Sequence, residues 1–485
     1  MSATALASPV TPARTAWQPP AALLGAVAWA AACLLCHSLS VDLFVWCTGL
    51  GLAWAVSRPF VDGLRRGFDA FDVLPLFTLY YALSLLLRGA GLLTFVDSPY
   101  LRELGDAHTE RYRELVGWAF FVSALGMMAV YAGFHSRFGK RCGRTAAAAV
   151  PMLTSRWSGR RVLPVVIAMV VVGLSAATAR VHGPAGFLTA ASNPMKTGTE
   201  DALGYWWLIA ATEFAIVGYH VYMIALLLKR DRNFLSRYLV LGILLAVPLY
   251  LVSSSKFVLL RIFLLPWLYR HFIVRPLPIW RVMVSFAAFG ALFPFFYAYR
   301  ALGLMRLDAI GQYMDRVDSP LLLMFNRSYG TDSLMLILHR TGETLPFQWG
   351  HSLLDLFTFW IPRLLWPGKP ISFGLAFPAA YMPDMHWGTM TYASCSLPGE
   401  LYLNFHVPGV LAGCALLGVA MRVAYSLARS GPGGLLLYGY AFITAMHLVE
   451  GCIASQLETA ITHLVPALLA LLVLTRFARP RAVAA

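Results

Sequence analysis

The sequence has few charged residues, and it lacks the motifs of enzymes that bind nucleotides. Charged residues make up 13% of the 485-residue chain and hydrophobic residues 59%, whereas an ordinary soluble domain is about 25% charged. No Gly-rich phosphate loop, HExxH or GxSxG pattern occurs in the chain. The composition excludes an ordinary soluble domain. An enzyme that lacks a nucleotide site would need a substrate that is already activated.

Cysteines are also scarce, and internal repeats are missing. Cys33 and Cys36 have CxxC spacing, but they lie in an apolar run without a second pair, so we interpret them as packing residues. Cys395 is the only cysteine in the segment 300–406, and no disulfide framework is implied. The chain also lacks the internal repeat that marks the two halves of many secondary transporters.

What the sequence does have is a series of long apolar runs, with a mean hydropathy of +0.66. A helix needs about 20 apolar residues to cross a bilayer. We therefore predict an all-α polytopic membrane protein with about twelve spans. The pair 238–254 and 257–273 leaves open a hairpin that does not fully cross. The predicted spans are 21–38, 41–57, 71–95, 114–135, 162–180, 203–228, 238–254, 257–273, 281–299, 407–427, 434–450 and 460–476.

Basic residues in the connections predict the orientation. With the N-terminus inside, the short inner segments hold 22 Lys and Arg and the short outer segments hold five. By the positive-inside rule, we expect both termini to be cytoplasmic. Anchoring on anionic lipid explains the net charge of +15, so we do not expect the protein to bind nucleic acid. The predicted organisation is a disordered tail at 1–20, spans one to nine within 21–299, an outer loop at 300–406, three spans within 407–476 and a tail at 477–485.

Several charges fall inside the predicted spans, where a charged side chain is costly and usually functional or paired. Arg88 lies in the third span, while Lys256 and Arg261 begin the eighth. Glu213 and His220 share one face of the sixth span, since they are seven residues apart. Two interpretations remain open: an ion pair such as Arg88 with Glu213, or an outward-opening cationic cavity that binds a lipid diphosphate.

The loop 300–406 is too long for a plain connection, so we expect elements of its own. Two amphipathic stretches, Ser319–Arg340 and His351–Trp366, have apolar faces at helical spacing and predict helices that lie along the membrane surface. The polar residues of the first stretch are interpreted as a solvated face. They are Asp315, Asp318, Arg327 and Asp332.

A rigid basic turn follows the second stretch. Pro362 and Pro367 flank Arg363, and Lys369 stands between a glycine and a proline. Because proline fixes φ, both cations are presented at low conformational cost. Their role is either to bind phosphate or, with Trp366 at headgroup level, to anchor the loop at the interface.

The stretch SLPGELYLNF begins the helix of the tenth span. Ser396 is the predicted cap, and Pro398 suits the first turn. Glu400 lies in that turn and Asn404 follows on the same face. A carboxylate beside an amide at a helix start suits a general base with a neighbour that orients a hydroxyl. The alternative is a carboxylate that only stabilises the helix terminus.

These motifs resemble the O-antigen and exopolysaccharide repeat-unit polymerases of Wzy type. The likeness rests on a Pro-Arg and Trp-Pro-x-Lys-Pro turn at 362–370, a Gly-Glu-x-Tyr-x-Asn-Phe helix start at 399–405 and a Ser-Lys-x-x-x-x-Arg start at 255–261. The resemblance implies a GT-C glycosyltransferase of the bacterial inner membrane that needs no metal or other cofactor. Its donor is a glycan on undecaprenyl diphosphate and its acceptor a second lipid-linked unit, with a flippase and a chain-length regulator as further partners.

The resemblance also implies roles for individual residues. Glu400 is the base or the group that orients the acceptor. Fixed cations stabilise the charge that develops on the departing diphosphate. The diphosphate-binding candidates are Arg261, Arg363, Lys369, Lys256 and Arg88. The sugar-binding candidates are Asn404, Tyr402, Trp366, Trp387, Arg327, Asp384 and His386.

Two other functions remain open. One is a ligase, or a transferase that adds a single sugar from a polyprenyl phosphate, for which an acidic residue at the outer end of the first span, such as Asp42, would matter. The other is a lipid-linked glycan transporter, which predicts an internal repeat and a charged central pathway.

The predicted orientation can be tested by cysteine labelling in sealed cells. A cysteine placed at Thr344 should react with an impermeant maleimide, whereas one at Ser155 should react only after the membrane is opened. The opposite pattern would overturn the orientation.

Overall fold

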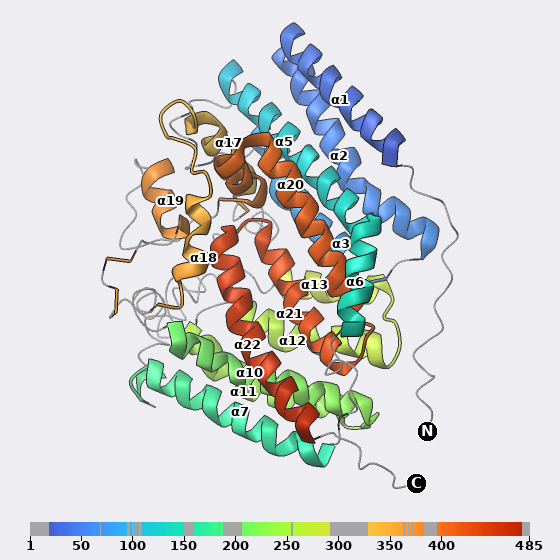
Figure 1. Ribbon diagram of the computed structural model, residues 1–485, viewed down its shortest axis with the longest axis vertical. Coiled ribbons are helices and arrows are strands. Elements are labelled where there is room, and N and C mark those ends of the chain that lie inside the picture. Colours follow the sequence, from blue (N-terminus) through green and yellow to red (C-terminus); the bar gives the residue numbers. More distant parts are fainter. Residues whose placement is uncertain are drawn as a thin grey trace.

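The computed structural model is a bundle of helices (Figure 1). No strand occurs among the residues that the structure describes. The chain is therefore an α-helical polytopic membrane protein, as the hydropathy predicts. The described residues are 19–67, 69–94, 98, 101, 104, 109–149, 157, 159–183, 185–187, 206–253, 256–291, 328–361, 365–366, 368–369, 373–382 and 395–477.

A helix occupies each of the twelve predicted spans over the described residues. Eight of the described helices are long and apolar enough to cross a membrane. They are α2 (Val41–Arg66), the continuous run α3 (Val73–Tyr81), η1 (Ala82–Leu87) and α4 (Arg88–Leu92), then α5 (Glu110–His135), α7 (Gly159–Arg180), α10 (Trp206–Leu228), α11 (Phe234–Ser253), α20 (Leu397–Leu427) and α22 (Ile453–Phe477). The other four are α1 (Pro19–Leu39), α12 (Lys256–Ile273), α13 (Ile279–Ala291) and α21 (Pro432–Leu448).

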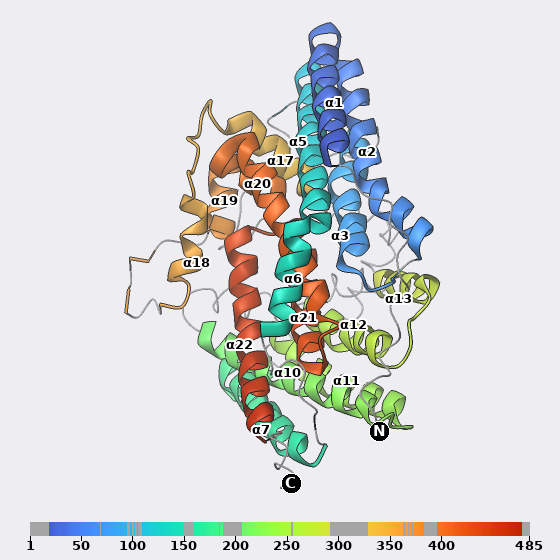
Figure 2. The same ribbon diagram turned by 45° about the vertical axis from the view of Figure 1, so that its right-hand side comes forward.

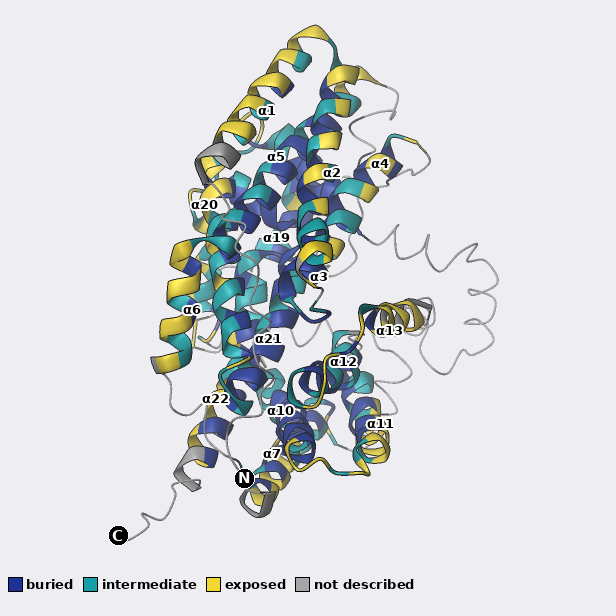
Figure 3. Cartoon of the chain, turned by 90° about the vertical axis from the view of Figure 1, so that its right-hand side faces the viewer, coloured by how far each residue is buried: buried dark blue, intermediate teal, exposed yellow. Residues whose placement is uncertain are grey.

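The helices form two groups (Figures 1 and 2). In the first, α5 packs against α2 and α20, and α6 (Arg137–Ala149) lies against α20. In the second, α10 packs against α7, α11 and α12. Helices α21 and α22 join the groups, since α21 contacts α20 and α12 while α22 contacts α10. Buried side chains face the contacts between helices, and exposed ones lie on outward faces such as that of α1 (Figure 3).

Glycines allow α5 and α20 to approach closely. A Cβ at Gly133 would lie 2.0 Å from the carbonyl oxygen of Ala415, and one at Gly418 would lie 2.1 Å from that of Val130. Any side chain at these two positions would push the backbones apart. Small residues are the usual means of close helix packing in membranes, where the surrounding lipid is as apolar as a leucine side chain. The contact holds α5 against the part of α20 that contains Ala415 and Gly418.

Charged residues at the helix ends fall into two groups, one for each side of the membrane in the predicted topology. Residues assigned to outer connections pair with one another, and so do residues assigned to inner ones. The grouping does not depend on which side is called outer. The outer pairs are Arg113–Asp42 at 2.5 Å and Arg111–Glu343 at 3.6 Å, and the inner pair is Asp69–Arg429 at 3.5 Å.

The described parts of the loop are built into the bundle. They comprise α17 (Gly330–Arg340), η6 (His351–Leu353), α18 (Asp355–Thr358) and α19 (Phe373–Tyr381). They gather on one flank beside the first turns of α20 and α22 (Figures 1 and 2).

The prediction that the first amphipathic stretch lies along the membrane surface is wrong for α17. Residues 330–337 are buried on every side of the helix, which contacts α5, η1 and α20. The assignment of Asp332 to a solvated face is also wrong, because its exposure is 0%. The helical apolar pattern is real, but packing against three helices buries the polar face as well. Asp315, Asp318 and Arg327 lie outside the described residues.

Candidate active site

The first turn of α20 is shaped by a cap and by close packing. Ser396 has the predicted capping role: its Oγ accepts a hydrogen bond from the backbone N–H of Gly399 at 3.2 Å. A Cβ at Gly399 would lie 2.8 Å from Oγ of Ser396 and 2.9 Å from Cδ1 of Ile337 in α17, so a larger residue here would have to displace both side chains. Pro398 occupies the first turn as predicted. The motif thus seats the helix against α17 and directs Glu400 inward.

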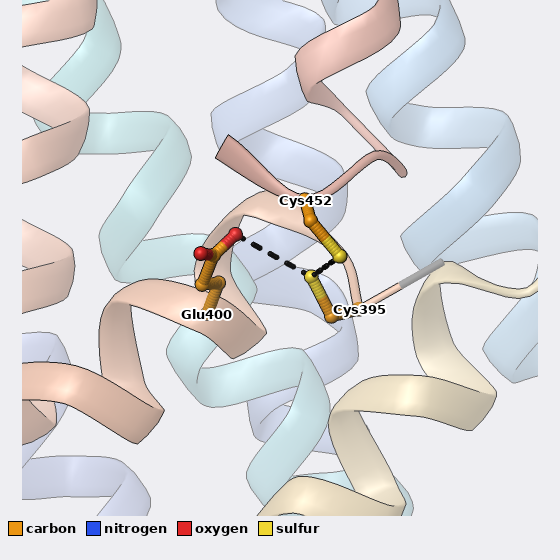
Figure 4. A group of neighbouring side chains, drawn as sticks. All are labelled: Cys395, Glu400 and Cys452. Carbon is orange, nitrogen blue, oxygen red and sulfur yellow. Dashed lines mark hydrogen bonds between the residues drawn. The ribbon is translucent and has the colours of Figure 1, made fainter. Parts of the chain in front are cut away.

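Glu400 is fully buried, with an exposure of 0%. Its Oε1 accepts a hydrogen bond from Ser352 Oγ at 2.7 Å. Its Oε2 accepts one from the backbone N–H of Ile453 at the start of α22, and Cys395 Sγ lies 3.4 Å from it (Figure 4). All three donors are neutral. A buried carboxylate is costly unless it is well hydrogen-bonded, and here both oxygens are satisfied by the protein.

Asn404 continues the same network one turn later. Its Nδ2 donates to Ser352 Oγ at 2.7 Å and to the carbonyl of Glu400 at 2.8 Å, and its Oδ1 accepts from Gly350 N at 2.8 Å. The prediction that Glu400 and Asn404 share a face is confirmed, because both contact the hydroxyl of Ser352. Ser352 is not among the predicted site residues, because a lone serine in an amphipathic stretch carries no signal. We call Ser352, Glu400 and Asn404 the loop-anchoring triad.

A second, partly buried carboxylate lies near the triad, in the turn between α21 and α22. Glu450 accepts hydrogen bonds from Ser84 and Ser328 at 2.6 Å each and from Tyr80 at 2.7 Å. Its backbone oxygen also accepts from the N–H of Ser396 at 2.9 Å. Ser84 belongs to η1, and π-helical turns of this kind often occur at functional sites. Glu450 is the last residue of the predicted span 434–450 and is not among the predicted site residues.

Arg88 is buried in an ion pair within the protein. Its Nε donates to Asp332 Oδ2 at 2.8 Å and its Nη2 to Oδ1 at 2.9 Å, which is the planar two-point geometry that a guanidinium favours. Ser98 also donates to Asp332. The suggested pairing of Arg88 with Glu213 is wrong, because α17 of the loop supplies the carboxylate.

Glu213 pairs with Arg261 instead. Arg261 Nη1 lies 2.6 Å from Glu213 Oε2, and the side chain of His463 contacts both residues. His220 also reaches this group, because its Nε2 lies 3.2 Å from the carbonyl oxygen of Arg261. Glu213 and His220 therefore do face one partner, as their spacing predicts. Arg88 and Arg261 thus lie in two separate paired clusters, which do not form the common cationic cavity that was considered.

Among the remaining basic candidates, Lys369 contacts the backbone of residues that precede it in the chain. Its Nζ donates to the carbonyl of Phe359 at 2.9 Å and lies 3.4 Å from that of Ile361. It also interacts electrostatically with Glu458 of α22. Lys256 is described only as the first residue of α12. The candidates Arg363, Trp387, Arg327, Asp384 and His386 lie outside the described residues.

Of the aromatic candidates, Tyr402 belongs to the same helix start and Trp366 to the loop before it. Tyr402 is half-buried, and its hydroxyl lies 3.2 Å from Nε2 of His406. The ring of Phe347 packs against both side chains. Trp366 is 39% exposed. The first turns of α20 thus carry Glu400 and Asn404, which are buried, and Tyr402, which is half-buried.

Comparison with protein-family models, with curated protein sequences and with solved structures gives no significant match. The functional interpretation therefore rests on the residues and their geometry.

The Arg88–Asp332 pair gives a test of whether Arg88 is structural. Arg88→Met leaves a buried carboxylate without its partner, and breaking such a pair costs about 3–5 kcal/mol. The double variant Arg88→Met with Asp332→Leu removes both charges and should recover most of the loss. Thermal unfolding in detergent measures both effects. A double variant as unstable as the single one would contradict the structural role.

Proposed function

We propose that the chain is a glycosyltransferase that polymerises undecaprenyl-diphosphate-linked repeat units on the outer face of the bacterial inner membrane. The observation that carries the proposal is the loop-anchoring triad. The Gly-Glu-x-Tyr-x-Asn-Phe segment, on which the resemblance to Wzy-type polymerases rests, is also the segment that holds the outer loop against the bundle. A motif that fixes a loop at one end of a membrane bundle suits an enzyme whose substrates are delivered by lipid.

In this proposal the triad positions the loop and does not itself remove a proton. Both oxygens of Glu400 already accept hydrogen bonds from the protein, so a substrate hydroxyl would first have to displace Ser352. The role of orienting the acceptor is therefore favoured over the role of general base. The carboxylate fixes Ser352, which follows the exposed Trp349 and precedes α18.

The diphosphate role falls on the basic turn. Arg88 and Arg261 are paired with Asp332 and Glu213, so we assign them to the scaffold. Lys369 holds the carbonyls of Phe359 and Ile361, which precede Arg363 in the chain. A guanidinium offers two parallel donors to phosphate oxygens. The exposed aromatic rings beside Tyr402 suit contact with the apolar faces of sugars.

The proposed reaction can be tested with purified protein and lipid-linked repeat units. A polymerase should convert them to a ladder of glycan lengths, resolved by gel electrophoresis or mass spectrometry. A single added sugar would instead identify a transferase that uses a polyprenyl phosphate. Unchanged lipid that moves between leaflets of a vesicle would identify a transporter, and either result would overturn the proposal.

The role of Glu400 can be tested with Glu400→Gln, Ser352→Ala and the double variant. If Glu400 acts through Ser352, both single variants should lower turnover, and the double variant should lose little more than either, because the two residues form one unit. The pH–rate profile should keep its shape. Glu343→Gln, an exposed carboxylate of the loop, is the matched control.

A general base would behave differently. Glu400→Gln would then lose about a hundredfold to ten-thousandfold in rate, whereas Ser352→Ala would lose little, and the acidic limb of the pH–rate profile would disappear. That pattern would contradict the positioning role. Turnover of lipid-linked units and thermal stability should be measured on the same preparations.

A further inference from the structure

Two cysteines that are distant in sequence meet beside the loop-anchoring triad. Cys395 precedes α20, and Cys452 lies in the turn between α21 and α22. Their sulfur atoms are 2.7 Å apart, and both residues are fully buried (Figure 4). The sequence alone predicts no disulfide, because Cys395 is the only cysteine in the segment 300–406.

The backbone holds the two cysteines together. The N–H of Ser396 donates to the carbonyl of Glu450 at 2.9 Å, and the N–H of Leu397 donates to that of Val449 at 3.1 Å. These bonds join the residues directly next to Cys395 with the residues just before Cys452. The sulfur contact is therefore set by the main chain of both segments and not by a side-chain rotamer alone.

The short sulfur separation favours a covalent bond over a shared metal ion. Two thiolates on one tetrahedral zinc, at about 2.3 Å each, lie about 3.8 Å apart. The sulfurs here are much closer than that. Glu400, the third ligand that a metal would need, already accepts hydrogen bonds from Ser352 and Ile453.

The predicted topology supplies a second, independent argument. Cys395 falls in the outer loop 300–406, and Cys452 falls in the outer connection between the spans 434–450 and 460–476. The other five cysteines fall in spans or in an inner segment. Disulfides form in the periplasm and outside the cell and are rare in the cytoplasm. The only two cysteines assigned to the oxidising side are thus a pair whose sulfur atoms lie 2.7 Å apart.

We propose that Cys395 and Cys452 form a disulfide that ties the start of α20 to the turn between α21 and α22. One thiolate attacks an external protein or small-molecule disulfide and releases one thiol of that oxidant. The second cysteine then attacks the mixed disulfide and releases the other thiol, so that the oxidant gains both electrons and both protons. The proposal rests on the outer orientation in the proposed function, but not on the reaction catalysed.

Burial decides when this exchange takes place. Burial in the folded protein raises the pKa of the Cys395 thiol well above its usual range, because the charged thiolate loses its hydration. Thiolate is the reactive form, so the folded thiol is a poor nucleophile. The bond therefore forms before the two segments close, and the same burial then shields it from reductants. Glu400 keeps Ser352 and Ile453 as donors after the thiol hydrogen is gone.

The test counts reactive thiols in the full-length protein. Cells are quenched in acid, and the protein is denatured and alkylated with a heavy maleimide, with or without prior reduction. We expect five of the seven cysteines to react before reduction and all seven after it. Mass spectrometry of an unreduced digest should contain the peptide that links Cys395 to Cys452.

Matched variants separate this pair from the other close cysteines, Cys33 and Cys47, whose sulfurs are 3.3 Å apart. Cys395→Ala should leave all six remaining cysteines reactive without reduction. Cys33→Ala should leave four reactive and keep the linked peptide. Seven reactive cysteines in the unreduced wild type would overturn the proposal, and so would one equivalent of zinc released on denaturation. None of these readouts depends on activity, so they distinguish failure of the disulfide from failure of the proposed function.

Discussion

The arrangement of the loop against the start of α20 depends on the hydroxyl of Ser352. It donates to Glu400 and accepts from Asn404, so one side chain from the loop satisfies two buried groups on the first two turns of α20. An unsatisfied polar group costs several kcal/mol in an apolar setting, and therefore neither side of this contact is stable alone. The loop and the helix start fold as one unit, and the adjacent turn before α22 joins them through the N–H of Ile453.

The charges inside the helix groups are also explained by the cost of leaving a buried polar group without a partner. Each buried arginine in the described spans has a carboxylate partner: Asp332 for Arg88 and Glu213 for Arg261. The first pair crosses from the spans into the loop and holds α17 in the bundle, whereas the second joins α10 to α12. Buried charges thus specify which elements meet, while the apolar surfaces, which pack equally well against lipid or protein, do not.

The sequence was sufficient to predict the helices, because long apolar runs and capping residues such as Ser396 act locally. It was also sufficient to place Glu400 and Asn404 on one face, because helical spacing is fixed. It failed where partners come from distant segments. Nothing near Ser352 or Glu450 in the chain indicates that each is the centre of a polar network. The amphipathic pattern of α17 is the same for a surface helix as for a helix buried by three neighbours, so the prediction of a solvated Asp332 was wrong.

The break in α20 has a consequence for how the chain tolerates change. Phe405 and His406 leave the helical conformation, with φ of −140° and 58°, just after Asn404 completes its contacts. An unbroken helix turns by about 100° per residue. Each insertion or deletion in the part of α20 that follows the break would then rotate Glu400 away from the loop. At an irregular joint that rotation is absorbed instead. The long part of α20 can therefore keep the register that its glycine contact with α5 demands, while the turns that carry Glu400 and Asn404 keep their own orientation toward the loop.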